Sequence, residues 1–194
     1  MGLVAATIAN HGGAMKKAAL ALALLGFVAA DPAQPQSRPP LRDKAEQPCG
    51  ALPKPFDGVA FAVDGNTLAI VGKKPNVRIW GIQAPELRDK DKRETVPGMR
   101  ARAALEDLLA PAGHKVHCNP THWDHSCRIV ASCVAKTTEI GGRMIDDGMA
   151  YGFQLDDATE ADVPLSLSYA ESEAAARKEK RGLWPMWLAE PMPR

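Results

Sequence analysis

The sequence from Val77 to Glu86 reads VRIWGIQAPE, a largely apolar run that ends at a proline and a glutamate. Its β-branched and alternating residues indicate a strand, which we place from Val77 to Ile82. Two similar runs precede it, Val59 to Val63 and Thr67 to Val71, and short turn-forming segments separate the three. The sequence therefore predicts a three-stranded meander.

A hairpin and several helices are predicted after the meander. Leucines on one side and charged residues on the other indicate a helix from Gly98 to Ala110, which Pro111 ends. The hairpin arms run from His114 to Cys118 and from Arg128 to Ala135, and further helices are expected around Ile140–Gly148 and Leu165–Arg181. These elements predict an α+β fold, a small antiparallel β-barrel with about three helices packed around it.

Length and composition limit the class of protein. The chain has 194 residues, 45% hydrophobic and 24% charged, which excludes collagen-like, coiled-coil and wholly disordered proteins and favours one globular domain. The formal net charge of +1 provides no whole-molecule attraction to nucleic acid or to an anionic membrane. Any binding to such partners must therefore be local.

The N-terminal part predicts export. Residues 1–30 form an expected signal peptide, with Lys16 and Lys17 before an apolar run and small residues before Asp31. Met1 to Ala14 is either an over-extended start or a long n-region. The apolar run is shorter than the roughly 20 residues of a membrane-spanning helix, although an uncleaved anchor is the alternative. We expect a periplasmic or secreted protein with no stable membrane association after cleavage.

Beyond the signal peptide, three parts are predicted. Residues 31–55 contain seven prolines and are interpreted as an extended tether. The folded domain is expected over residues 56–187, and residues 188–194 form a tail.

The four cysteines form an even set, and disulfides are the default in an oxidising compartment. Three pairings are open from spacing alone. Cys118 and Cys133 lie on the two arms of the expected hairpin, which favours a bond between them. Cys49 and Cys127 then remain as the second pair.

Five segments resemble the thermonuclease, or staphylococcal-nuclease-like, family in sequence, order and spacing. They are Val63–Leu68, Val77–Glu86, Asp124–Arg128, Gly148–Ala150 and the stretch from Tyr169 through Arg177 to Trp184. The resemblance extends from about Phe56 to Trp184. It implies a five-stranded OB-type barrel with three helices, in agreement with the elements predicted above.

The resemblance also implies a chemistry. Members of this family cleave DNA and RNA with a calcium ion held by carboxylates, a glutamate that activates water and two arginines on the phosphate. Arg78, Glu86 and Arg128 match these arginines and this glutamate, which are the implied catalytic residues. Guanidinium groups suit the role because they bind phosphoryl oxygens in pairs and stabilise charge that develops in the transition state.

The implied metal ligands depart from the family pattern. The matching positions are Asp64, Asn66 and Gln83, and the family has aspartate where this chain has Asn66 and Gln83. Amide oxygens bind calcium, but two formal charges are missing and affinity follows ligand charge. We therefore expect weakened calcium binding.

The turn before Arg128 also departs from the family pattern. Ser126 replaces a family tyrosine that lines the nucleotide site, and Cys127 replaces a glycine. Stacking of a base on an aromatic ring contributes about 1–3 kcal/mol, so affinity should fall unless Trp123 or His122 takes over. A cysteine in place of glycine also limits the conformations of the turn.

Structural roles compete with these assignments. Asp64 begins a turn between strands, and Arg78 and Glu86 can form surface ion pairs. A zinc site could use the histidines at 114, 117, 122 and 125 with Cys118 or Cys127, but the spacing is not a standard one and export favours disulfides. Zinc is therefore not expected.

The sequence thus predicts an exported thermonuclease-family protein, a phosphodiester hydrolase acting on DNA or RNA with weak or altered-metal activity. The alternative is a catalytically inactive OB-fold module that binds nucleic acid, another anionic ligand or a protein partner. Loss of the ligand carboxylates favours the module, and retention of Arg78, Glu86 and Arg128 favours the enzyme.

Overall fold

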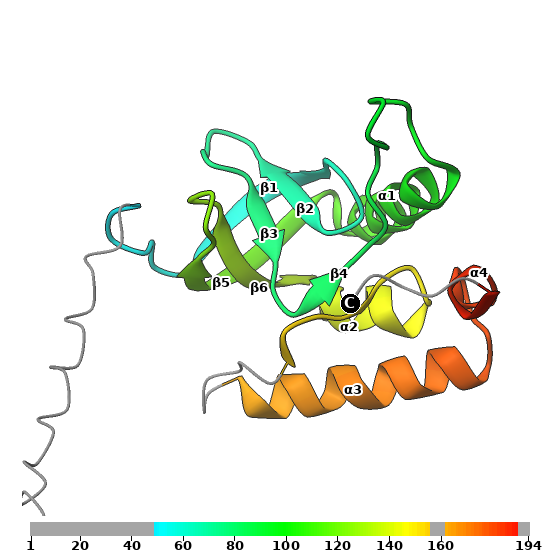
Figure 1. Cartoon of the computed structure of the whole chain (residues 1–194). Coiled ribbons are helices and arrows are strands. Elements are labelled where there is room, and N and C mark those ends of the chain that lie inside the picture. The colour runs from blue at the N-terminus through cyan, green and yellow to red at the C-terminus, as the bar shows by residue number, and fades with distance from the viewer. Residues whose placement is uncertain (1–48, 156–161, 190–194) are drawn as a thin grey trace, which may run out of the picture. The chain divides into compact units, whose positions relative to one another are not determined.

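Five strands close into an OB-type barrel in the computed structural model, which describes residues 49–155 and 162–189 (Figure 1). The predicted signal peptide, the first part of the tether and the last residues of the tail lie outside the described residues. Within the described part of the chain, no helix is both long enough and apolar enough to span a lipid bilayer.

The strands and helices alternate along the chain. The strands are β1 (Phe56–Ala62), β2 (Thr67–Ile70), β3 (Val77–Ile79), β4 (Ile82–Gln83), β5 (Lys115–Trp123), β6 (Ile129–Ala135), β7 (Thr138–Glu139) and β8 (Tyr151–Gly152). The α-helices are α1 (Val96–Leu109), α2 (Ile140–Asp146), α3 (Val163–Lys178) and α4 (Trp184–Ala189), and a 3₁₀ turn, Ala110–Ala112, follows α1. Helix α4 includes the first two residues of the predicted tail.

The predicted α+β barrel is confirmed, with one correction to its strand directions. Around the barrel the order is β3-β2-β1-β5-β6, and β6 returns to β3. Four of these pairs are antiparallel, but β3 and β6 are parallel. Five is an odd number, so strands that alternate in direction around a closed ring must leave one parallel pair. The barrel is therefore mixed rather than purely antiparallel.

The strand predicted from Val77 to Ile82 is interrupted. Strand β3 ends at Ile79, and Gly81 adopts a φ of 69°, a left-handed conformation that favours glycine. The chain resumes as β4, which leaves the barrel and pairs with β8, so that Gln83 lies opposite Tyr151. This bend returns Gln83 toward Arg78, as described below.

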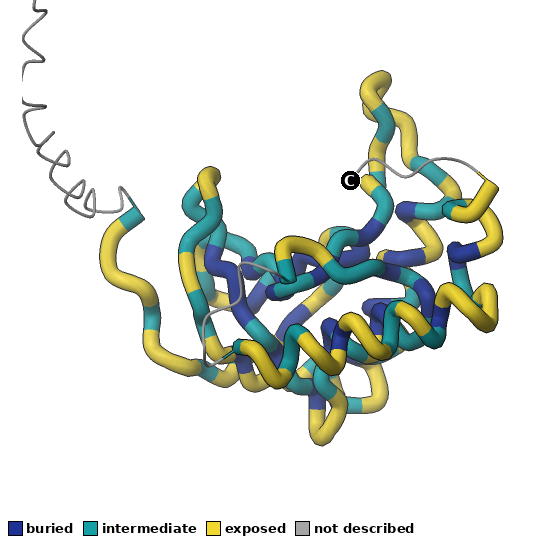
Figure 2. The backbone as a smooth tube through the Cα atoms, turned by 60° about the horizontal axis from the view of Figure 1, so that its bottom comes forward, coloured by how far each residue is buried: buried dark blue, intermediate teal, exposed yellow. Residues whose placement is uncertain are grey.

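The core lies inside the barrel and continues between the helices (Figure 2). Helix α1 buries Ala101, Leu105 and Leu109, while α2 lies between the barrel and α3. Tyr169 of α3 is fully buried, and its hydroxyl donates to Glu139 at 2.9 Å. The Glu139 carboxylate also accepts from the first backbone N–H groups of α2, so one side chain connects both helices to the barrel.

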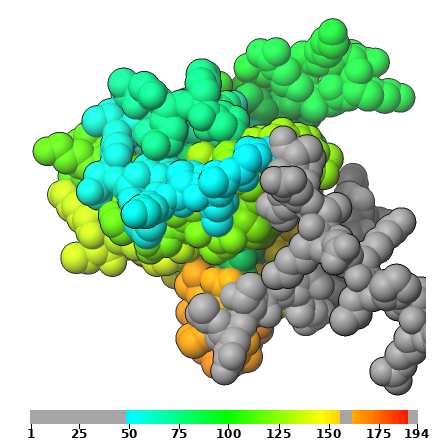
Figure 3. All heavy atoms as spheres, turned by 90° about the vertical axis from the view of Figure 1, so that its left-hand side faces the viewer, coloured from blue at the N-terminus to red at the C-terminus, as the bar shows by residue number. Residues whose placement is uncertain are grey.

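Two disulfides are present, Cys118–Cys133 and Cys49–Cys127, the pairs named from the sequence. The first joins directly opposite residues of β5 and β6. The second attaches the segment before β1 to the β5–β6 turn, and Trp123 Nε1 donates to the Gly50 carbonyl at 3.0 Å. In Figure 3 this segment, drawn in cyan together with the start of β1, lies on the surface of the domain. The end of the predicted tether is thus fastened to the domain.

Candidate functional site

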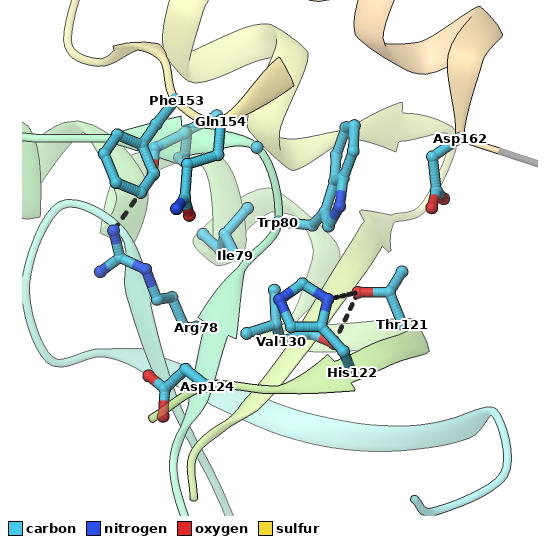
Figure 4. A pocket seen from close by; sticks show the side chains of 12 residues that line it. Arg78, Ile79, Trp80, Thr121, His122, Asp124, Val130, Phe153, Gln154 and Asp162 are labelled. Carbon is cyan, nitrogen blue, oxygen red and sulfur yellow. Dashed lines mark hydrogen bonds between the residues drawn. The ribbon is translucent and has the colours of Figure 1, made fainter. Parts of the chain in front are cut away.

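A pocket of about 370 Å³ opens beside strand β3 (Figure 4). Its lining combines apolar walls with a few polar side chains, which is typical of ligand sites. The lining side chains include Arg78, Ile79, Thr121, His122, Asp124, Val130, Phe153 and Gln154. Three barrel strands, β3, β5 and β6, and the segment after β8 therefore contribute to it.

Arg78 lies in the middle of β3, between Thr67 of β2 and Val130 of β6. Its guanidinium donates to Asn66 Oδ1 at 3.3 Å, to Gln83 Oε1 at 2.5 Å and to the Ile82 carbonyl at 3.4 Å. All three acceptors are neutral. The ring of Phe153 lies 5.9 Å from the guanidinium carbon, a cation–π distance.

The charge of Arg78 is poorly compensated. Burial lowers the pKa of Arg78, and the positive charge of Arg128 lowers it further, against the opposing effect of the carboxylates of Asp64, Asp124 and Glu86. An arginine remains protonated even so. The lowered pKa means that burial and the charge of Arg128 disfavour the charged form of Arg78, and an anionic ligand would favour that form.

Glu86 is placed by the start of helix α1. Thr95 is the N-cap of this helix: its hydroxyl accepts from the Gly98 N–H at 3.1 Å and donates to the Glu86 carbonyl at 2.6 Å. A side chain at position 98 would collide with that carbonyl and with Leu87, so glycine is required there. Within residues 49–155 and 162–189, the exposed Glu86 carboxylate has no hydrogen-bond or ion-pair partner.

Arg128 belongs to a tightly bonded turn. The Asp124 carboxylate accepts from Arg128 Nε at 2.6 Å and from the backbone N–H groups of Ser126 and Arg128 at 2.9 Å each. Burial opposes ionisation of Asp124, but these hydrogen bonds outweigh it and hold the pKa of Asp124 below its ordinary value. Cys127 within this turn has a φ of 54°, a left-handed conformation that favours glycine.

The three residues implied as metal ligands do not form a carboxylate cluster. Asp64 Oδ1 accepts from the Asn66 N–H at 2.9 Å, which is the turn role considered for it. The amide oxygens of Asn66 and Gln83 both accept from Arg78. Asp64 is the only one of the three that carries a formal negative charge.

Other residues named from the sequence are distributed around the turn. Ser126 is exposed at the turn and does not line the pocket, and Trp123 is engaged with Gly50. His122 does line the pocket. Sequence reasoning missed Phe153 and Gln154. The available sequence signal for Phe153 was an aromatic residue directly after Tyr151-Gly152. In the structure Phe153 is 37% exposed.

Two other histidines of the considered zinc cluster, His114 and His117, have separate partners. His114 contacts the Ala60 carbonyl and Glu106, and His117 contacts Asp57 at 2.9 Å. All four cysteines are in disulfides. The described residues contain no group of three histidine, cysteine or carboxylate side chains arranged to hold a metal ion.

Comparisons with known proteins identify the family. Comparison with curated proteins gives no match. Residues 76–186, from the start of β3 into α4, match the family model described as Staphylococcal nuclease homologue. That span contains Arg78, Glu86 and Arg128 and exceeds half of the chain. The protein therefore belongs to the staphylococcal nuclease homologue family.

Proposed function

We propose that this protein is an exported nuclease of its family that binds the phosphodiester backbone of DNA or RNA with Arg78 and Arg128. The supporting observation is the position of Arg78: a half-buried guanidinium with only neutral acceptors, repelled by a second arginine. A phosphate between the two cations would place negative charge in direct contact with them through charge-assisted hydrogen bonds. Glu86, whose carboxylate is exposed, is the proposed base for water.

Calcium binding is weakened in this proposal. Calcium favours several oxygen ligands with negative charge, and Asp64 is the single carboxylate of the implied set. The oxygens of Asn66 and Gln83 are directed at a guanidinium, and a calcium ion on the same atoms would face the repulsion of Arg78. The donor set therefore fits calcium poorly, and hydrolysis that depends on it should be slow.

The decisive experiment measures cleavage of single-stranded DNA by the purified protein in calcium, in manganese and in chelator. The natural protein is compared with Arg78→Ala and with the double variant Asn66→Asp, Gln83→Asp. We expect weak cleavage by the natural protein, none by Arg78→Ala, and at least about tenfold faster calcium-dependent cleavage by the double variant, because ligand charge is restored. Arg143→Ala is the matched control, since Arg143 is an exposed arginine paired with Asp147 outside the pocket.

The alternative is a binding module without hydrolysis, favoured by the engagement of both amide oxygens with Arg78. The module would be supported if the natural protein binds the oligonucleotide in chelator but never cleaves it, and the double variant does cleave it. Absence of both binding and cleavage in the natural protein would overturn the phosphodiester site itself.

A further inference from the structure

We propose a further activity for this pocket: cleavage of RNA without a metal ion, in which His122 removes the proton of a ribose 2′-hydroxyl while Arg78 and Arg128 bind the adjacent phosphate. The inference rests on the proposed function, because it uses the same phosphate-binding arginines. It adds a route of cleavage that uses the ribose 2′-hydroxyl and therefore acts on RNA alone, and it adds a catalytic residue, His122.

A β-bulge directs His122 to the pocket. In the β5–β6 ladder Pro120 lies opposite Ala131 and His122 lies opposite Val130, so Thr121 is an extra residue in β5. Side chains alternate along a strand, and Val116 and Cys118 face the core. An unbroken strand would turn His122 inward with them. The extra residue reverses the alternation, and His122 lines the pocket instead (Figure 4).

The strand register brings His122 and Arg78 into one row. Arg78 of β3 lies opposite Val130 of β6, and Val130 lies opposite His122 of β5. Two strand spacings separate the backbones of Arg78 and His122, a distance on the order of 10 Å. All three residues line the pocket, so the two polar side chains flank Val130. A phosphate and its ribose can lie between them.

Thr121 determines which nitrogen of His122 is available. The Thr121 hydroxyl donates to the Val130 carbonyl at 3.2 Å, and it lies 3.0 Å from His122 Nδ1. A hydroxyl has one proton, so in the second contact the oxygen accepts and His122 Nδ1 carries the hydrogen. The neutral ring then has its lone pair on Nε2, the nitrogen that Figure 4 shows on the Arg78 side. This arrangement orients a histidine base by a neighbouring acceptor.

The chemistry balances without a metal. The 2′-hydroxyl proton moves to His122 Nε2 as the 2′-oxygen forms a bond to phosphorus, and the bond from phosphorus to the 5′-oxygen breaks. The departing 5′-oxygen takes a proton from water, and the resulting hydroxide neutralises the imidazolium. The products are a 2′,3′-cyclic phosphate and a 5′-hydroxyl. The guanidinium groups stabilise the charge on the phosphoryl oxygens, the role that a metal ion would otherwise have.

The test compares RNA and DNA oligonucleotides of one sequence with the purified protein in chelator. We expect cleavage of RNA only, with cyclic phosphate ends identified by mass spectrometry and no cleavage at a 2′-O-methyl position. His122→Gln should lower the rate by at least about 100-fold, the usual contribution of a general base. His117→Gln is the matched control, an exposed histidine of the same strand that contacts Asp57, and its rate should not change.

Thr121 supplies a second test. Thr121→Val removes the acceptor for Nδ1–H and should slow RNA cleavage by about tenfold, whereas Thr121→Ser keeps the hydroxyl and should restore the rate. Rescue by serine distinguishes orientation of His122 from a general effect on the strand.

Three results would overturn the inference: no RNA cleavage in chelator, equal cleavage of DNA, or an unchanged rate for His122→Gln. A measurement of binding to an uncleavable DNA oligonucleotide distinguishes failure of this inference from failure of the proposed function. If binding persists and depends on Arg78, the phosphodiester site stands and only the role of His122 is wrong. If binding is absent, both proposals fail.

Discussion

Arg78 lines the pocket and Arg128 is near enough to lower its pKa, but the two arginines belong to regions that are stabilised in opposite ways. Arg78 projects from the middle of barrel strand β3 and donates only to neutral oxygens. Arg128 lies at the end of a turn, pairs with the Asp124 carboxylate and is next to a disulfide to the segment before β1. In one region the sheet fixes the position, and the guanidinium has neutral hydrogen-bond partners with carboxylates acting only from a distance. In the other, an ion pair and a covalent bond fix a turn.

This contrast indicates how the two arginines divide the work. Arg78 has no carboxylate in direct contact, so its guanidinium is available to an anion and should provide most of the binding energy. The charge of Arg128 is partly neutralised by Asp124, so Arg128 should contribute less binding energy and act mainly through its fixed position. Four predictions test this division.

The largest effect is expected from removal of the Cys49–Cys127 disulfide. The bond closes a loop with a sequence separation of 78. The double variant Cys49→Ser, Cys127→Gly should lower the free energy of unfolding by about 2–4 kcal/mol, measured by urea denaturation. Glycine keeps the left-handed conformation of position 127, so Cys49→Ser with Cys127→Ser should be less stable still. A loss of unfolding free energy below about 1 kcal/mol would mean that the disulfide to the segment before β1 does not constrain the turn.

The second prediction concerns the arginines themselves. Arg78→Ala should weaken binding of a single-stranded oligonucleotide by about 100-fold, about 2.8 kcal/mol, because charge-assisted hydrogen bonds to a phosphate are lost. Arg128→Ala should weaken it by about tenfold, because Asp124 already neutralises part of that charge. Fluorescence anisotropy at low salt measures both. Equal losses would break the proposed division between the two regions.

The third prediction concerns acid. The pKa of Asp124 lies below its ordinary value of 3.8 in the folded protein, so its carboxylate stabilises the fold above that pH and loses this effect as the pH falls through the folded pKa. Asp124→Asn should cost about 1 kcal/mol of stability at pH 7. The difference in stability between the two proteins should vanish in strong acid. Urea denaturation midpoints measured from pH 7 to pH 2 follow this difference. A difference that is constant with pH would show that the ion pair contributes nothing.

The smallest effect is expected at Phe153, whose ring contacts Arg78 on the pocket wall. Phe153→Ala should weaken oligonucleotide binding by about fivefold, near the lower end of the stacking range of about 1–3 kcal/mol, since Phe153 is 37% exposed. Phe61→Ala is the control, because Phe61 is an exposed aromatic residue stacked on His114 outside the pocket. Equal effects of the two variants would remove Phe153 from the site.

Several features of the site could be predicted from local sequence because local forces cause them. The alternation around Val77–Ile82 and the turn residues after Val63 determine strands and turns within a few residues of themselves. The motifs around Arg78, Glu86 and Arg128 indicated the family, and residues 76–186 match its model. The replacements at Asn66 and Gln83 are also visible without any structure.

Tertiary structure decided what depends on pairing between distant strands. The parallel contact of β3 with β6 follows from closing an odd number of strands, and no local pattern contains it. Gly81 bends β4 away from the barrel, which places the Gln83 amide against Arg78. The side on which His122 lies depends on a bulge relative to β6, because a strand alone has no register. Sequence by itself determined which chemical groups the protein carries. Packing across the barrel decided which of them share the pocket.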